Sequence, residues 1–360
     1  MVLNFFLCAL LFFTMQSGCL AAEPQPCFLV AQLQQPGALS SHNEISKLVG
    51  LAKEKNVNIL FVQVYRANQA WFPSQIADSG PYRTCFKNLS EDPFNLLIQK
   101  AHGQGIKVYA WINLLSLSTN TGAFILKDYG VDILTRNLQE KKTLADYKID
   151  NQYFLEPGDP RVRKELSAIV EEIIRTYPDL DGILLDYIRY PDAKPDYGYT
   201  KINIERFKDA TGFKKIDSSS LIWKNWKRAQ VNELLTLLVN RVRTLRPGMR
   251  IGSTGCVPYT RAYYEAYQDW PTWVNSGLVD FVLLMSYPDN LPEFSADIQE
   301  AKEKVKDFKK VYIGLPAYKL LHSSEIFGEQ LGSAKLSGAG AWVVFHYNSL
   351  LESPELMDRL

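Results

Sequence analysis

The chain has 360 residues, of which 46% are hydrophobic and 22% are charged, so it is long enough to bury one large hydrophobic core. Its 40 Lys and Arg residues balance 39 Asp and Glu residues, which leaves no net field to attract a nucleic acid or an anionic membrane. The composition therefore argues against a polyanion-binding protein and favours one large domain or two modest ones.

The first residues have the pattern of a secretory signal peptide. An apolar run covers residues 5–13, and small residues follow at 17–22. Because this run is too short to span a bilayer, we predict a cleaved leader over residues 1–22 and a mature domain over residues 23–360. The sequence QSGC also resembles a lipoprotein site, so a lipid anchor at Cys19 is an open alternative. In either case we expect export to the periplasm, the cell surface or the medium.

Eight short runs rich in β-branched and aromatic residues alternate with longer amphipathic segments, which is typical of parallel α/β proteins. The predicted strands cover residues 28–33, 59–65, 106–112, 182–188, 250–256, 280–287, 310–316 and 341–347. Helical patterns begin after the N-cap residues Ser41, Asp92 and Asp159, and the longest covers residues 221–248. Eight β-then-α units without a break in composition predict a single-domain (β/α)8 TIM barrel.

In a TIM barrel the active site lies at the carboxyl ends of the strands, where polar and aromatic residues accumulate in this chain. The predicted substrate-binding residues at these ends are Arg66, Trp71, Trp111, Asn113, Tyr187, Arg189, Tyr259, Tyr287 and His346. Long connections at 115–155 and about 192–220 follow two of the strands, and long loops of this kind commonly build binding sites. We therefore expect an aromatic-walled cleft at this end of the barrel.

Asp186, in the segment DGILLDYIRYP, is the first candidate for a catalytic residue. Strand alternation places Leu184, Asp186 and Ile188 on one face, so an inward-facing Asp186 would lie just below the barrel rim. There it could act as nucleophile, base or acid, with Arg66 or Arg189 tuning it. The alternative is a structural ion pair between a buried Asp186 and an arginine.

Aromatic residues at the strand ends could stack on sugar rings, and hydrolysis of a glycosidic bond normally requires two carboxylates. Glu156, in the long connection after the third strand, and Asp289, after the sixth, are candidates for the second, with Glu293 as a rival. Each has the alternative role of a solvated loop acid. His346 could serve as acid or base, or as a hydrogen-bonded wall residue. The four His residues show no HxH or HExxH spacing, so we expect no metal and no cofactor.

Six stretches, in order along the chain, resemble the glycosyl hydrolase-like 10 family of bacterial proteins. They are VYRANQAWFPS, DPFNLLIQKAHGQGIKVYAWIN, LEPGDPRVRKEL, DGILLDYIRYP, YQDWPTWVNSGLVDFVLLMSY and YIGLPAYK. The resemblance covers about residues 28–350 and implies an exported TIM barrel that acts on a cell-wall or other polysaccharide. Carried over by position, it makes Asp186 the acid of the fourth strand, and it makes Arg66, Asn113, Tyr187 and Tyr287 residues of the pocket.

Two positions depart from the family pattern, since Leu184 stands where the family often has His, and Glu156 replaces a more usual Asp or Asn. The fourth strand lacks the DGxDxDxE signature of family 18 chitinases. The segment GLPAYK at the seventh strand lacks the Glu that serves as nucleophile in family 10 xylanases. We therefore predict a monomeric O-glycosyl hydrolase with no nucleic-acid partner and no membrane span. A non-catalytic glycan-binding barrel is the competing hypothesis. A metal-dependent hydrolase is a third, against which the few His residues argue.

Overall fold

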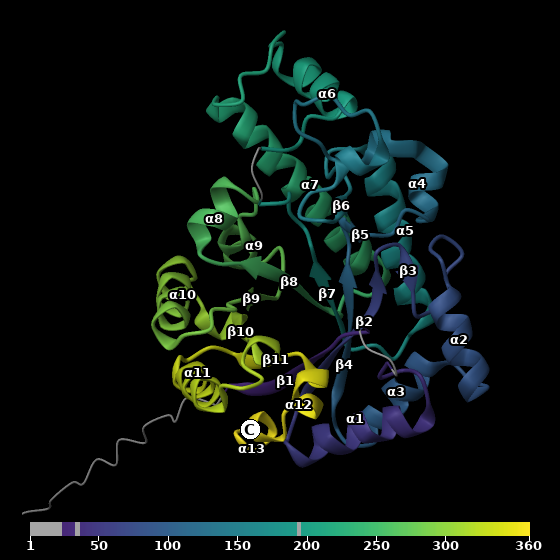
Figure 1. The fold of residues 1–360 in the computed structure, drawn as a ribbon, viewed down its shortest axis with the longest axis vertical. Helices are drawn as coiled ribbons and strands as arrows, with labels where there is room; N and C mark the ends of the chain where they lie inside the picture. Colours follow the sequence, from purple (N-terminus) through teal and green to yellow (C-terminus); the bar gives the residue numbers. More distant parts are fainter. Residues whose placement is uncertain (1–23, 33–36, 193–195) are drawn as a thin grey trace, which may run out of the picture.

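The structure is a computed structural model that describes residues 24–32, 37–192 and 196–360. Eight parallel strands form a closed barrel, because the first strand pairs with both the second and the last (Figure 1). The strands are β1 (Gln25–Val30), β2 (Ile59–Arg66), β4 (Lys107–Asn113), β7 (Gly182–Asp186), β8 (Arg250–Cys256), β9 (Phe281–Met285), β10 (Val311–Leu315) and β11 (Ala341–Phe345). All eight predicted strands are present, which confirms the single-domain (β/α)8 barrel.

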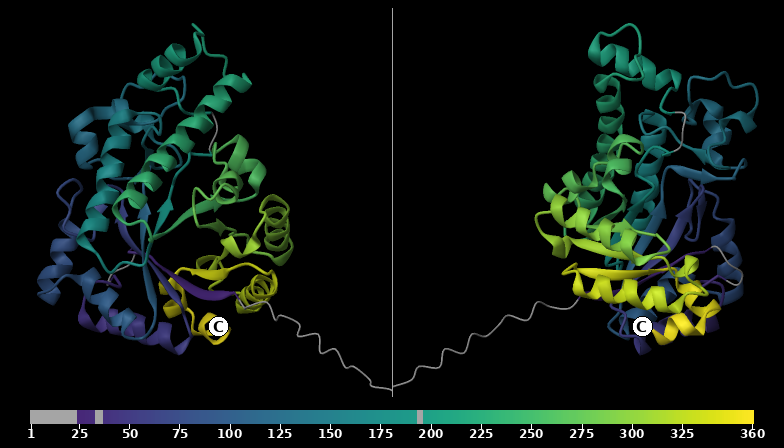
Figure 2. Two further views of the ribbon diagram at one scale, coloured as in Figure 1. Left: turned by 180° about the vertical axis from the view of Figure 1, so that it is seen from behind. Right: turned by 60° about the vertical axis from the view of Figure 1, so that its left-hand side comes forward.

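Helices cover the outside of the barrel (Figure 2). They are α1 (His42–Glu54), α2 (Gly80–Leu89), α3 (Pro93–His102), α5 (Pro160–Thr176), α7 (Leu221–Leu245), α9 (Trp270–Asn275), α10 (Leu291–Lys304), α11 (Ser324–Leu336), α12 (Tyr347–Glu352) and α13 (Pro354–Asp358). The predicted N-caps are confirmed, since Ser41, Asp92 and Asp159 each accept a hydrogen bond from a main-chain N–H two or three residues further on. These side chains satisfy N–H groups that the first helical turn leaves without a partner.

Strand alternation divides the apolar side chains between two cores. Inward-pointing side chains form a compact cluster inside the barrel, which includes Leu29, Phe61, Trp111, Leu184, Phe281 and Leu283. Outward-pointing side chains, such as Ile183 and Leu185 of β7, pack under the helices in the main core. The barrel is therefore filled with side chains, and a binding site has to lie above this plug at one end.

The two long predicted connections extend the carboxyl end of the barrel. The first contains a small antiparallel pair, β5 (Ser116–Ser118) and β6 (Tyr153–Phe154), together with α4 (Phe124–Tyr129). The second leads from β7 to α6 (Lys201–Thr211). In Figure 1 both lie beyond the arrowheads of β4 and β7, where the strands end. A shorter hairpin of β2 with β3 (Gln69–Ala70), and α8 (Tyr259–Tyr264) after β8, also lie at strand ends.

The predicted leader over residues 1–22, with Cys19, lies outside the described residues. Within residues 24–32, 37–192 and 196–360, no helix is both long enough and apolar enough to cross a membrane. The cysteines of the barrel, Cys27, Cys85 and Cys256, are buried free thiols. No disulfide therefore joins these three cysteines of the described domain.

Candidate active site

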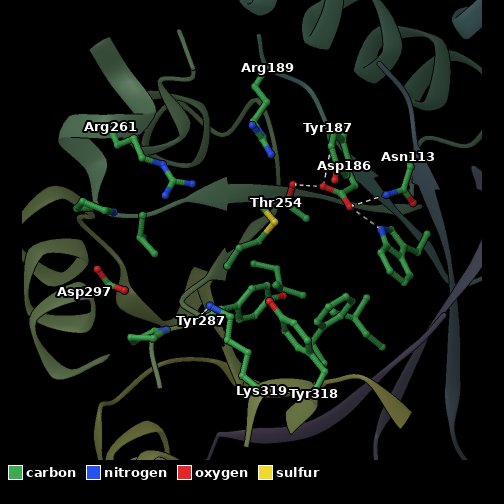
Figure 3. A pocket seen from close by; sticks show the side chains of 18 of the residues that line it. Asn113, Asp186, Tyr187, Arg189, Thr254, Arg261, Tyr287, Asp297, Tyr318 and Lys319 are labelled. Atoms are coloured by element: carbon green, nitrogen blue, oxygen red, sulfur yellow. Dashed lines mark hydrogen bonds between the residues drawn. The ribbon is translucent and has the colours of Figure 1, made fainter. Parts of the chain in front are cut away.

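A cavity of about 770 Å³ opens at the carboxyl end of the barrel (Figure 3). Ends of β2, β4, β7, β8, β9 and β11 contribute to its walls, together with α8, α10 and the segment that follows β10. Of the predicted site residues, those that line it are Arg66, Trp111, Asn113, Asp186, Tyr187, Arg189 and Tyr287. The expected aromatic-walled cleft is thus present where the strand ends predict it.

Asp186 ends β7 and is 3% exposed. Its Oδ2 accepts hydrogen bonds from Trp111 Nε1 at 2.9 Å and from Asn113 Nδ2 at 3.1 Å. Its Oδ1 accepts from Thr254 Oγ1 at 2.6 Å and from the main-chain N–H of Tyr187 at 2.7 Å. Four donors suit an ionised carboxylate, which only accepts hydrogen bonds. No ion pair between described residues includes Asp186, so the alternative of a structural pair with an arginine is not what the structure shows.

The chain turns sharply directly after Asp186. Tyr187 has a φ of 58°, in the left-handed region that bulky residues seldom adopt. This turn brings Tyr187 to the cavity beside Asp186 and buries Ile188 in the main core under the helices. The prediction that Ile188 shares the inner face with Leu184 is therefore wrong, because strand alternation stops where β7 ends.

A chain of amide hydrogen bonds fixes Asn113 behind Asp186. Gln63 Nε2 donates to Asn113 Oδ1 at 2.8 Å, and Gln63 Oε1 accepts from the main-chain N–H of Gln32 at 3.1 Å. Because the oxygen of Asn113 is already an acceptor for Gln63, its NH₂ group is the part that faces Asp186. Side chains of β2, β4 and β7 thus hold one carboxylate in a defined orientation.

Aromatic rings form the wall opposite these polar groups. Tyr287 stacks on Phe345, with ring centroids 5.2 Å apart and an interplanar angle of 13°. Tyr318 packs edge-on against both rings, and Trp111 packs edge-on against Phe345 at 5.9 Å. Such a surface suits the apolar face of a sugar ring. Sequence analysis did not single out Tyr318 or Phe345, although Phe345 could have been found as the last inward-pointing residue of its strand.

The predicted second acids, Glu156 and Asp289, do not line the cavity. Glu156 is completely buried, and it accepts hydrogen bonds from Tyr190, from Thr135 at 3.0 Å and from the N–H of Gly158 at 3.3 Å. Burial raises the pKa of Glu156 above its usual value, although the hydrogen bond from Tyr190 opposes this. Asp289 is exposed and lies outside the cavity. The structure thus corrects both predictions: Glu156 ties two loops together, and Asp289 is a solvated loop acid.

The acids that share the cavity with Asp186 are Asp297 and Glu293 of α10. Asp297 is partly buried and accepts a hydrogen bond from Ser286 Oγ at 2.7 Å. Burial raises its pKa above the usual value, and the negative charges of Glu300 and Glu293 add to this rise. Figure 3 shows Asp297 and Asp186 on opposite sides of the cavity. Sequence analysis named Glu293 as a rival and missed Asp297, which lies four residues later in an amphipathic helix.

Comparison with known families decides what this barrel belongs to. Residues 30–328 match the family described as Glycosyl hydrolase-like 10. The chain belongs to this family. The resemblance predicted from its six motifs is therefore confirmed.

Named relatives resemble the chain in sequence, and solved structures resemble it in fold. "Glycosyl hydrolase DigH" of Escherichia coli (strain K12) is 24% identical over 323 residues, which cover 82% of this chain and 69% of the relative. "Glycosyl hydrolase YngK" of Bacillus subtilis (strain 168) is 23% identical over 300 residues, which cover 77% and 56%. The catalytic domain of a β-amylase from Paenibacillus polymyxa superposes with a TM-score of 0.57 at 13% identity, covering 93% of this chain and 97% of that one. A β-galactosidase from Marinomonas ef1 gives 0.56 at 11% identity, covering 90% and 54%. The two solved structures show the fold, a TIM barrel.

Three predicted binding residues of this glycosyl hydrolase-like 10 protein do not line the cavity. Trp71 packs against the main core, and the Tyr259 hydroxyl donates to Asp269 at 2.9 Å. His346 is buried at the start of α12, where its Nδ1 accepts from the N–H of Ser349 at 3.3 Å. Burial lowers the pKa of His346, which favours the neutral form of the ring. His346 thus takes its alternative role, that of a hydrogen-bonded wall residue.

The described part of this glycosyl hydrolase-like 10 chain contains no group of three or more His, Cys, Asp or Glu side chains placed to hold a metal ion. What the cavity offers instead is a carboxylate surrounded by donors, a second acid of raised pKa, and an aromatic wall. Two carboxyl groups in contrasting environments are the parts that acid–base chemistry at a glycosidic bond requires.

Proposed function

We propose that this protein is a glycoside hydrolase that cleaves a bacterial cell-wall or other polysaccharide by carboxylate catalysis. The observation that carries the proposal is Asp186, a buried carboxylate at a barrel strand end that faces a cavity with an aromatic wall. Membership in the glycosyl hydrolase-like 10 family supports it, as do relatives named glycosyl hydrolases.

Asp186 is the group that acts on the anomeric carbon, either directly as a nucleophile or as the base for an attacking water. Its four hydrogen bonds hold both oxygens in place before substrate arrives, so little reorganisation is needed as positive charge develops on the sugar ring. Trp111, Asn113 and Thr254 are positioning residues in this scheme.

Asp297 is the proton donor to the leaving oxygen. Its raised pKa lets it keep a proton at a pH where an ordinary aspartic acid has lost it. Ser286 holds the carboxyl group through one oxygen, which leaves the other oxygen free to face the cavity. Glu293 lies on the same helix and contributes negative charge that favours the protonated form of Asp297.

The test is a screen of the wild-type chain and the Asp186→Asn variant against denuded peptidoglycan strands and common polysaccharides, with release of reducing ends as the readout. We expect the wild type to hydrolyse one of these glycans and Asp186→Asn to lose about 100- to 10,000-fold in kcat while still binding it. Asp289→Asn is the matched control, because Asp289 is exposed outside the cavity, and it should match the wild type.

A non-catalytic glycan-binding barrel would give a different result in the same screen. The wild type would then bind a glycan without releasing reducing ends, and Asp186→Asn would change nothing but affinity. That outcome would replace the hydrolase proposal with the binding one.

We propose further that the protein is exported and acts as a monomer. The leader pattern of residues 1–22 supports export, with Cys19 as the site of a lipid anchor if the lipoprotein alternative holds. Fractionation of cells that express the wild type or Cys19→Ser distinguishes the two forms of export, since only an anchored protein is released into the soluble fraction by the substitution. Light scattering of the mature chain measures its oligomeric state.

A further inference from the structure

Arg66 stands at the end of β2 and lines the cavity with a partly buried side chain. Within the part of the chain that the structure describes, its guanidinium forms no hydrogen bond and no ion pair with an acid. Burial lowers the pKa of Arg66, as expected for a cation that has lost part of its water without gaining an acid. Such a group is costly in the free protein, and the cost falls when an anion binds.

A second cationic side chain, Arg189, lies against Tyr187. The guanidinium of Arg189 lies over the Tyr187 ring, with its centre 5.1 Å from the ring centroid. Arg189 shares a single carboxylate, Asp192, with Arg261, at 3.0 Å and 2.7 Å. Asp192 is thus the acid that forms ion pairs with both guanidinium groups, and Asp297 also lies within the electrostatic influence of Arg261. Figure 3 shows both arginines pointing into the cavity. Among the arginines that line the cavity, Arg189 and Arg261 therefore have an ion-paired carboxylate, and Arg66 has none within the described residues.

The remaining acids of the cavity do not supply the missing charge to Arg66. Asp297 and Glu293 belong to α10, and Asp297 lies on the opposite side of the cavity from Asp186. Asp186 itself is engaged with four donors. A neutral sugar would use the aromatic wall and leave Arg66 without an anion. A carboxylate on the sugar could accept two parallel N–H···O hydrogen bonds from the Arg66 guanidinium, which is the geometry that a guanidinium favours.

We propose that the glycan bound beside Asp186 carries a carboxylate, and that Arg66 binds it. This inference rests on the proposed function, because it names the substrate class of the same cavity. The carboxylate can come from a uronic acid ring or from a lactyl ether on an amino sugar, and the two present the same chemistry to Arg66. Arg66 is thus a specificity residue that separates acidic from neutral glycans.

The experiment measures binding by calorimetry in the full chain with the Asp186→Asn substitution, so that no probe is consumed. The probes are oligogalacturonate, hyaluronan oligosaccharides and denuded peptidoglycan strands, each in native and carboxyl-reduced form. We expect at least one native probe to bind about 10- to 100-fold more tightly than its reduced form, as for hydrogen bonds to a charged group. Comparison of the uronate and lactyl probes identifies the source of the carboxylate.

Adding Arg66→Gln should abolish the preference for the native probe, because it weakens binding of the native probe and leaves binding of the reduced probe unchanged. Arg66→Lys should keep part of the preference, because lysine retains the positive charge but lacks the planar guanidinium that binds a carboxylate through two hydrogen bonds. Arg175→Gln, which removes an exposed arginine of α5, is the matched control and should keep the full preference. Thermal melting of each variant shows that it folds. The proposal is overturned if native and reduced probes bind alike, if Arg66→Gln weakens both equally, or if no acidic probe binds.

Turnover by the wild type keeps this result separate from the proposed function. Equal hydrolysis of native and carboxyl-reduced strands would leave the hydrolase proposal standing and remove this inference. Binding that depends on the carboxylate and on Arg66, without hydrolysis of any probe, would support this inference and remove the hydrolase proposal.

Discussion

At the scale of single residues, the site depends on two aspartic acids whose surroundings differ. Asp186 faces four hydrogen-bond donors, whereas Asp297 has one donor, partial burial and two acidic neighbours. Donors favour the charged form of a carboxyl group, and burial with nearby negative charge favours the neutral form. The two environments therefore assign the carboxylate role to Asp186 and the acid role to Asp297.

We predict that Asp297→Asn lowers kcat by about 100-fold or more, because general acid catalysis typically contributes that much. In the wild type, kcat/KM should fall as pH rises through the raised pKa of Asp297, since only the protonated form donates. The pH–rate profile of the variant should lack this alkaline limb. Glu303→Gln, which removes an exposed acid from the same helix, should keep both the rate and the limb. An unchanged limb in Asp297→Asn would assign the proton donor elsewhere.

At the scale of elements, the sequence predicts the regular parts of the molecule better than their ends. N-cap residues and apolar periodicity correctly place α1, α3 and α5, because both signals are local. Alternation fails at Ile188, because the positive φ of Tyr187 turns the chain where β7 stops. No pattern in the neighbouring sequence predicts that turn.

The second catalytic acid could not be predicted from local sequence patterns either. Glu156 looked suitable because it follows a strand in a long loop, but its partners Tyr190 and Thr135 are distant in sequence and bury it completely. Asp297 gave no comparable signal, because it lies inside a helix and not directly after a strand. Which acid reaches the cavity depends on how α10 packs on the barrel, and this is a tertiary property.

Packing of α5 on the loop after β2 leads to a prediction about stability. Glu165 of α5 accepts a hydrogen bond from Asn68 at 3.4 Å, and burial, followed by the charge of Asp128, raises its pKa to about 7. The folded state thus holds this proton more tightly than the unfolded state, whose pKa is near 4.5. This group therefore lowers the free energy of unfolding progressively as pH rises from about 4.5 to about 7.

Glu165→Gln should remove this pH-dependent decrease in the free energy of unfolding. Urea unfolding at pH 8 should show the variant more stable than the wild type by about 1 kcal/mol, a value reduced for the partial exposure of the side chain. At pH 5 the two should be nearly equal. The exposed Glu140→Gln change should have no effect at either pH. A variant that follows the wild-type pH dependence would show that Glu165 is not the group responsible.

At the scale of the whole molecule, the closed barrel is what brings the site together. Arg66, Asn113, Asp186 and Thr254 are far apart in sequence, yet each lies at or near the carboxyl end of its strand and therefore lines one cavity. The fold, the family, Asp186 and part of the aromatic wall, namely Trp111 and Tyr287, follow from the sequence. Thr254, the rings of Tyr318 and Phe345, and the identity of the second acid required the three-dimensional arrangement.

The central claim is that the Asp186 carboxylate performs the chemistry, and chemical rescue tests it most directly. Asp186→Ala removes the carboxylate and leaves space for a small anion, so turnover on the glycan that the wild type hydrolyses should be measured with and without sodium azide. We predict a loss of at least about 100-fold in kcat without azide and a recovery of about 10-fold or more when azide supplies the missing anion. Turnover of Asp186→Ala within about threefold of the wild type in the absence of azide would contradict the account.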